Sequence, residues 1–104
     1  LERTKTKIQF IFREFTSLEI NLAHINKNKR SDYTNSEVEF LARKLIDRLT
    51  LWPSGTKQFQ NEFCSYFVRT GEVFNKQYKI VFCICSDKPK TLGIITLHRT
   101  KARK

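Results

Sequence analysis

Three strand patterns joined by short turns fill the second half of the chain, and they restrict its fold more than any other feature. The patterns cover residues 62–69, 73–85 and 92–100, and turns are expected at 70–71 and 87–90. A parallel pair of strands needs a crossover of about a dozen residues, and these connections are far shorter. The sequence therefore predicts an antiparallel meander sheet.

The central strand of this meander is expected to be 73–85, because its residues are nearly all apolar on both faces after Lys79. Cys83 and Cys85 are two apart within it, so they share a face and are typical of small core residues. With Cys64 they make three cysteines, and no Cys-x2-Cys spacing or nearby histidine indicates zinc. We therefore expect no disulfide framework, no metal site and a reducing, cytoplasmic compartment.

One helix is marked clearly, by a capping signal and by an apolar stripe. Thr34 and Glu37 have the spacing of a capping box, and Tyr33 and Val38 have that of a hydrophobic staple. Apolar residues then recur at helical period, with charged residues on the other side: Val38, Leu41, Ala42, Leu45, Ile46 and Leu49. The sequence predicts a main helix over about 35–49, packed on the meander.

The segments on either side of this helix are less regular. Residues 7–13 and 18–22 alternate as strands do, and we favour strands there, although residues 8–25 also fit a helix. Residues 51–60 contain Trp-Pro-Ser-Gly, which predicts a loop, and Trp52 and the phenylalanines are expected in the core. With 104 residues, the chain is expected to form one domain, 1–104, of the α+β class.

The net charge of +10 is concentrated at the two ends of the chain. Residues 1–30 contain seven basic and three acidic residues, 31–87 contain seven of each, and 88–104 contain six basic residues and no acidic one. If both ends lie on one face, they form an electrostatic footprint for nucleic acid or for an acidic protein. A membrane partner is not expected, because no apolar run approaches the roughly 20 residues of a membrane span.

The sequence lacks the residue patterns that most kinds of enzyme active site require. The ten acidic residues are scattered, and neither Gly-x-Ser-x-Gly nor a glycine-rich phosphate loop occurs. Cleavage of RNA by its own 2′-hydroxyl still fits, because the substrate then supplies the nucleophile. The protein needs only acid–base groups and cations for this reaction, with no metal and no cofactor.

Both histidines lie within basic segments, and histidine is the side chain best suited to proton transfer near neutral pH. On the last strand, His98 and Thr100 are expected on one face and Arg99 on the other, unless the strand twists or bulges. The structural alternatives are that His24 ends a strand, that His98 is an edge-strand histidine, and that the cations are solvated. The two segments contain His24, Lys27, Lys29 and Arg30, and His98, Arg99, Thr100 and Lys101.

These residues resemble a known group, the RelE-like or barnase–EndoU–colicin–RelE superfamily of small bacterial ribonuclease toxins. The first point of similarity is His24-x5-Arg30, followed by polar residues and a helix that opens at residues 36–38. The second is a closing pair of strands, 78–82 and 92–99, with polar residues at the end. The chain departs from members with two helices before the sheet, since one helix is indicated here.

The resemblance implies a RelE/barnase-like fold with its site on the concave face of the sheet. It implies a metal-independent endoribonuclease toxin, held by an acidic antitoxin or immunity protein. The toxin would act in the cytoplasm of its own cell or, as the C-terminal domain of a longer protein, in that of a target cell. Two other functions stay open: a non-catalytic nucleic-acid-binding module and an interaction domain for an acidic protein. The implied catalytic residues are His24, Arg30, His98 and Thr100, and the implied phosphate-binding residues are Lys27, Lys29, Arg99 and Lys101.

Overall fold

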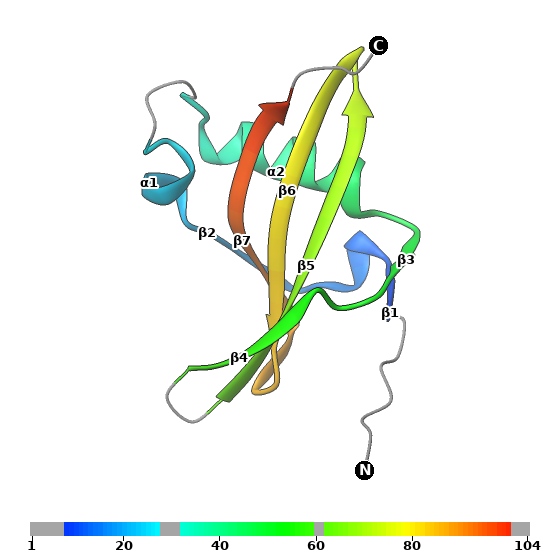
Figure 1. Ribbon diagram of the computed structural model, residues 1–104, viewed down its shortest axis with the longest axis vertical. Coiled ribbons are helices and arrows are strands. Elements are labelled where there is room, and N and C mark those ends of the chain that lie inside the picture. Colours follow the sequence, from blue (N-terminus) through cyan, green and yellow to red (C-terminus); the bar gives the residue numbers. More distant parts are fainter. Residues whose placement is uncertain (1–7, 28–31, 60–61, 101–104) are drawn as a thin grey trace.

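The computed structural model describes residues 8–27, 32–59 and 62–100, and it has the α+β architecture expected from the sequence (Figure 1). One main helix lies against one face of a five-stranded sheet, and a small two-stranded sheet includes the strand that follows this helix. None of the helices in the described ranges is long and apolar enough to cross a bilayer.

The larger sheet has the strand order β2-β7-β6-β5-β4. Strands β4 to β7 are antiparallel in sequence order, so the predicted meander is confirmed, and β2 adds a parallel partner at the edge of β7. The sheet is therefore mixed. The elements are β1 (Ile8–Phe10), the 3-10 helix η1 (Phe12–Glu14), β2 (Ser17–Ile20), α1 (Leu22–Ile25), α2 (Asn35–Ile46), β3 (Leu49–Leu51), β4 (Gly55–Phe59), β5 (Glu62–Val73), β6 (Lys76–Cys85) and β7 (Lys88–Thr100).

Helix α2 begins where the sequence predicts and ends three residues earlier. Its capping box is confirmed: Glu37 N donates to Thr34 Oγ1 at 3.2 Å, and Thr34 N donates to Glu37 Oε1 at 2.8 Å. At the other end, Asp47 has extended dihedral angles and its Oδ1 accepts a hydrogen bond from Phe12 N at 2.8 Å. This contact helps turn the chain out of the helix, and Leu49 enters β3, which pairs with β1.

The N-terminal segment forms strands at residues 8–10 and 17–20, as favoured from its alternation, and the alternative of one helix over 8–25 is wrong. The first strand is shorter than predicted, because η1 interrupts it. The backbone N–H of Phe12, the first residue of η1, is bonded to the Asp47 side chain instead of a sheet partner. A tertiary contact therefore ends this strand.

The core lies between α2 and the sheet, and three phenylalanine rings occupy its centre. Phe10 meets Phe67 and Phe82 edge to face, with ring centroids 4.9 and 5.2 Å apart, and the latter two rings stack at 5.5 Å. All three side chains are fully buried, and the burial of each stabilises the folded state by about 1.5–3 kcal/mol. The surrounding core contains Val38, Leu41, Ala42, Leu45 and Ile46 of α2, and Ile80, Leu92, Ile94 and Leu97 of the sheet.

Several aromatic residues lie outside this core, which corrects the expectation that all would be buried. The exposed fractions are 52% for Trp52, 55% for Phe63, 74% for Phe74 and 41% for Phe40. Trp52 lies in the short link between β3 and β4. This link is shorter than predicted, because most of the expected 51–60 loop pairs with β5 as strand β4. Likewise β7 begins inside the turn expected at 87–90.

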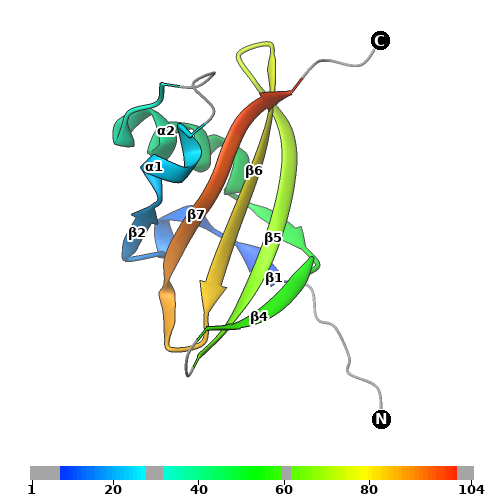
Figure 2. The same cartoon turned by 60° about the vertical axis from the view of Figure 1, so that its left-hand side comes forward.

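Strands β5 and β6 form one long curved hairpin (Figure 2), whose turn is at Phe74 and Asn75 and not at the predicted 70–71. Both turn residues have positive φ, 52° and 65°, as tight hairpin turns commonly require. Gly71 lies inside β5, where an added Cβ would be 3.1 Å from Leu45 Cδ2 of α2. This glycine therefore permits close packing of strand and helix. The prediction of a turn at this glycine is wrong.

Cys64 and Cys85 form a disulfide, which contradicts the expectation of unpaired cysteines. The register of β5 and β6 sets these two residues opposite each other. Spacing along the sequence does not reveal such a relation between two strands. The expectation of a reducing compartment rests on unpaired cysteines, and it loses that support.

Cys83 is unpaired and half-buried. A Cβ at Gly93 would lie 3.0 Å from its Sγ, so the glycine leaves room for the thiol. Burial raises the pKa of the Cys83 thiol, the Glu19 carboxylate raises it further, and the Lys88 ammonium lowers it. Glu19 and Lys88 also form an ion pair with N and O 3.5 Å apart.

Gly71→Ala should destabilise the protein, because Leu45 is only 1% exposed and has little room to move away from a new methyl group 3.1 Å from its Cδ2. We expect the free energy of unfolding in urea to fall by about 1–3 kcal/mol. Gly55→Ala is the matched control, a strand glycine with nothing within 4 Å of an added Cβ, and its stability should be unchanged or slightly higher. Equal losses in both variants would contradict the packing role of Gly71.

Alkylation of Cys83 by iodoacetamide at pH 8 should be slower than that of a thiol in an unstructured peptide, because the raised pKa leaves less thiolate. Glu19→Gln should speed the reaction, and Lys88→Gln should slow it, since these two charges shift the pKa in opposite directions. The free energy of unfolding should also decrease as the pH rises through the ordinary thiol pKa, where the unfolded chain loses a proton that the folded one keeps. A rate equal to that of the peptide would show that the thiol is not protected.

Candidate functional site

The sheet face opposite α2 carries several polar side chains of the meander. In β6, Tyr78, Ile80 and Phe82 are buried on the α2 side, so alternation directs Lys79 and Val81 to the other face. We call this other side of the sheet the open face. Figure 1 views it directly, with α2 behind the strands.

A bulge in β7 decides which of its residues reach the open face. The register with β6 shifts by one residue at Ile95, which has no partner. Ile94 and Leu97 are therefore both buried, although they are three residues apart. Regular alternation resumes at Leu97 and brings His98 and Thr100 to the open face, the shared face expected from the sequence. Without the bulge, alternation from Ile94 would direct His98 into the core.

His98, Lys79 and Thr70 are direct neighbours across three strands of the open face. Lys79 pairs with His98 of β7 on one side and with Thr70 of β5 on the other. Side chains in such positions have Cβ atoms about 4.5–5.5 Å apart. Thr100 lies two residues beyond His98 on the same face. We call Thr70, Lys79, His98 and Thr100 the open-face cluster.

The hydrogen bond of the His98 ring indicates its tautomer. Nδ1 lies 3.2 Å from the carbonyl oxygen of Arg99, and a carbonyl oxygen only accepts. The proton of the neutral ring is therefore on Nδ1, and Nε2 carries the lone pair. The open-face cluster thus combines a proton acceptor, a cation and two hydroxyl groups, which suits it to bind a phosphodiester and to move a proton. In the described ranges, no group of three or more His, Cys, Asp or Glu side chains lies together as a metal site would require.

Arg99 does not belong to this cluster. It pairs with Tyr78, whose side chain is buried on the α2 side, so alternation directs Arg99 to the face opposite His98. Three other candidates from the sequence, Lys29, Arg30 and Lys101, lie outside the described residues.

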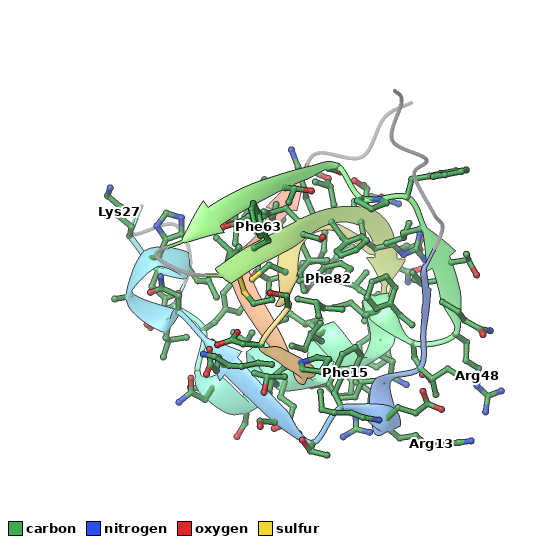
Figure 3. All side chains as sticks on the ribbon, turned by 90° about the horizontal axis from the view of Figure 1, so that it is seen from below. Arg13, Phe15, Lys27, Arg48, Phe63 and Phe82 are labelled. Carbon is green, nitrogen blue, oxygen red and sulfur yellow. A yellow bond between two sulfur atoms is a disulfide. The ribbon has the colours of Figure 1, made fainter. Side chains whose placement is uncertain are left out.

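His24 lies in α1, which packs beside β7 at the edge of the sheet (Figures 1 and 2). The N-cap residue Asn21 donates its N–H to Ile94 O of β7 at 3.2 Å, and its side chain accepts from His24 N at 3.3 Å. Ile94 is four residues before His98, which is about 13 Å along a strand. The His24 side chain is exposed, and so is that of Lys27, which projects away from the molecule (Figure 3).

The described basic residues of the N-terminal region are divided between two sides of the molecule. Arg13 of η1 lines a hollow of about 390 Å³ between η1, β2 and α2, on the side opposite Lys27 (Figure 3). Arg43 of α2 lines it too, but its guanidinium lies 4.9 Å from the centre of the Phe12 ring and bridges to Glu39 at 3.6 Å. Arg13 and Lys27 therefore do not belong to one basic face.

Lys79 and Thr70 were not predicted as site residues from the sequence. A signal for Lys79 was present, since it is the one charged residue in the run 78–85, and a charge within an apolar strand indicates an outward position. Thr70 had no such signal. Its position beside Lys79 depends on the hairpin turn, and the turn was expected at Thr70 itself.

Comparison with protein-family models, with curated proteins and with solved structures finds no match to the chain.

Proposed function

We propose that the protein is a metal-independent endoribonuclease toxin whose active site is the open-face cluster. The observation that carries this proposal is the pairing of Lys79 with His98, which sets a cation beside an imidazole whose Nε2 has an available lone pair. RNA carries a hydroxyl next to each phosphodiester, so the protein needs no nucleophile of its own.

In the proposed reaction, His98 Nε2 accepts the proton of the 2′-hydroxyl, and the 2′-oxygen attacks the neighbouring phosphorus. Lys79 stabilises the additional negative charge on the pentacoordinate phosphorus, and the hydroxyls of Thr70 and Thr100 donate hydrogen bonds to its oxygens. The bond to the 5′-oxygen breaks, this oxygen takes a proton, and a 2′,3′-cyclic phosphate remains.

That proton is proposed to come from water. His24 remains a proposed catalytic residue, and α1 meets β7 at Ile94, about 13 Å along the strand from His98. Lys27 and Arg99 are proposed contacts to RNA phosphates outside the cluster. The same roles are proposed for Lys29 and Lys101, and Arg30 remains a proposed catalytic residue.

We also propose that the fold is RelE/barnase-like. The element order of the larger sheet supports this: an edge strand, β2, then two helices, then a meander whose last strand, β7, lies beside β2. The small sheet of β1 and β3 stands outside this order. The sequence indicated one helix before the sheet, and α1 supplies a second of four residues. The resemblance to members with two helices is therefore closer in the structure than in the sequence.

The proposed protein partner is an acidic antitoxin or immunity protein, which the net charge of +10 would attract. For its place of action we propose the cytoplasm of a target cell, reached as part of a longer toxin. The Cys64–Cys85 disulfide supports passage through an oxidising compartment over residence in the producing cell's cytoplasm.

Incubation of the protein with RNA in excess EDTA tests the proposed reaction. We expect cleavage that leaves 2′,3′-cyclic phosphate ends and that stops when the 2′-hydroxyl at the cleaved position is replaced by hydrogen. His98→Ala should lower the rate by about 10²–10⁴-fold. Lys79→Ala should lower it by about 100-fold or more. Lys90→Ala is the matched control, an exposed lysine at the other end of β7, and it should leave the rate within about two-fold of the parent.

Intact RNA in this assay, or equal cleavage by the His98 and Lys79 variants and the parent, rejects the nuclease. Binding without cleavage, with a steep salt dependence, would identify the protein as a non-catalytic nucleic-acid-binding module instead. No binding even at low salt would favour the interaction domain for an acidic protein.

A further inference from the structure

An aromatic groove lies at the end of the molecule where the β5–β6 hairpin turns. It has a volume of about 340 Å³ and lies between the hairpin and the N-terminal half of α2. We define it by its four aromatic residues: Tyr33, Phe40, Phe74 and Tyr78. The proposed reaction uses none of them.

Phe74 is an unusual residue for its position. Its φ of 52° lies in the left-handed region, which bulky side chains rarely adopt and which asparagine or glycine would occupy with less strain. Its side chain is 74% exposed, so burial offsets little of this strain. A strained, exposed aromatic residue in a turn indicates a role in binding and not in folding.

A second ring supports Phe74 from the side of α2. Phe40 is 41% exposed, and the two rings stack with centroids 5.9 Å apart and planes inclined by 21°. The outward side of Phe74 is left for a further planar group. Lys44 Nζ lies 5.6 Å from the centre of the Phe40 ring. Lys76 is exposed and follows Phe74 by two residues, so a second cation is available at this turn.

The groove and the open-face cluster lie on opposite faces of the sheet, toward the same end of the molecule. Tyr78 of the groove and Lys79 of the cluster are consecutive residues of β6, directed to opposite faces. They pair with Arg99 and His98, consecutive residues of β7. Both views show the hairpin turn and the end of β7 at the same end of the molecule (Figures 1 and 2). A strand of RNA bound at His98 can therefore pass over this end, with Arg99 beside its path.

We propose that the aromatic groove is a subsite for an unpaired base of single-stranded RNA, which stacks on Phe74. This inference rests on the proposed function and adds to it a substrate class, RNA that is single-stranded beside the cleaved bond. Surfaces that bind single-stranded nucleic acid combine aromatic rings, which stack on any base, with cations, which bind the phosphates. Glu37, which also lines the groove, uses Oε1 to accept the Thr34 N–H.

The test is the affinity for a short single-stranded RNA with 2′-O-methyl groups, which prevent cleavage, measured by fluorescence anisotropy. Phe74→Asn removes the ring and places in the turn a residue that tolerates positive φ, so the free energy of unfolding should not fall. We expect Kd to rise about ten-fold in this variant, and Phe74→Trp to bind at least as well as the parent. Phe63→Ala is the matched control, an exposed phenylalanine at the other end of β5, and its Kd should stay within two-fold.

A scan of the same RNA with single abasic nucleotides locates the stacked base. At one position, the parent should lose about ten-fold in affinity and Phe74→Asn should lose almost none, because the two changes remove the same contact. Equal Kd values for the parent and Phe74→Asn, or equal losses in the Phe74 and Phe63 variants, would overturn the subsite even if the protein cleaves RNA. A ring-dependent Kd in a protein that does not cleave RNA would keep the subsite and reject the nuclease. Failure of the parent to bind the RNA at all would overturn the subsite, leaving the groove to a protein partner.

Discussion

The rings of Phe10, Phe67 and Phe82 and the apolar stripe of α2 exclude water from one face of the sheet, and the positions of the polar side chains follow from this. Because alternate residues of β6 are committed to the buried face, Lys79 is held outward in the middle of the sheet. The bulge at Ile95 lets β7 bury both Ile94 and Leu97 and still present His98 outward. Core packing and the bulge residue Ile95 together determine the positions of the side chains that we propose to be catalytic.

Features specified by neighbouring residues were predictable from the sequence. The capping box of α2 depends on Thr34 and Glu37, three residues apart, and it forms as expected. The meander followed from the shortness of its connections, and the shared face of His98 and Thr100 followed from alternation.

Features that depend on contacts between distant segments were not predictable in this way. Gly71 resembles a turn residue until Leu45 is seen packed against it. The Cys64–Cys85 disulfide depends on the register of β5 and β6, and the short first strand depends on Asp47 of α2. The candidate site divides in the same manner. His98 and Thr100 could be chosen from the sequence, whereas Lys79 and Thr70 join them only through cross-strand pairing.

The described basic residues of the N-terminal end do not form the one basic face that the charge distribution along the chain suggests. The sequence places cations at both ends, and one shared basic face was the simplest arrangement. Among the described residues, Arg13 and Lys27 are on opposite sides, and Arg43 is paired with Glu39. The proposed site instead depends on one lysine beside one histidine. The pairing of their strands positions these two side chains more precisely than a general basic surface would.

The position of the disulfide in the hairpin gives the protein a stability that depends on its surroundings. Cys64 and Cys85 close a loop with a sequence separation of 21. Such a cross-link lowers the entropy of the unfolded chain, which raises the free energy of unfolding by about 3 kcal/mol. The thiol-rich interior of a cell removes this restriction, and a secretory or extracellular medium maintains it. For the delivered toxin that we propose, the polypeptide would therefore persist longer outside a recipient cell than inside it. Its lifetime inside would be limited by loss of a covalent link far from the proposed active site.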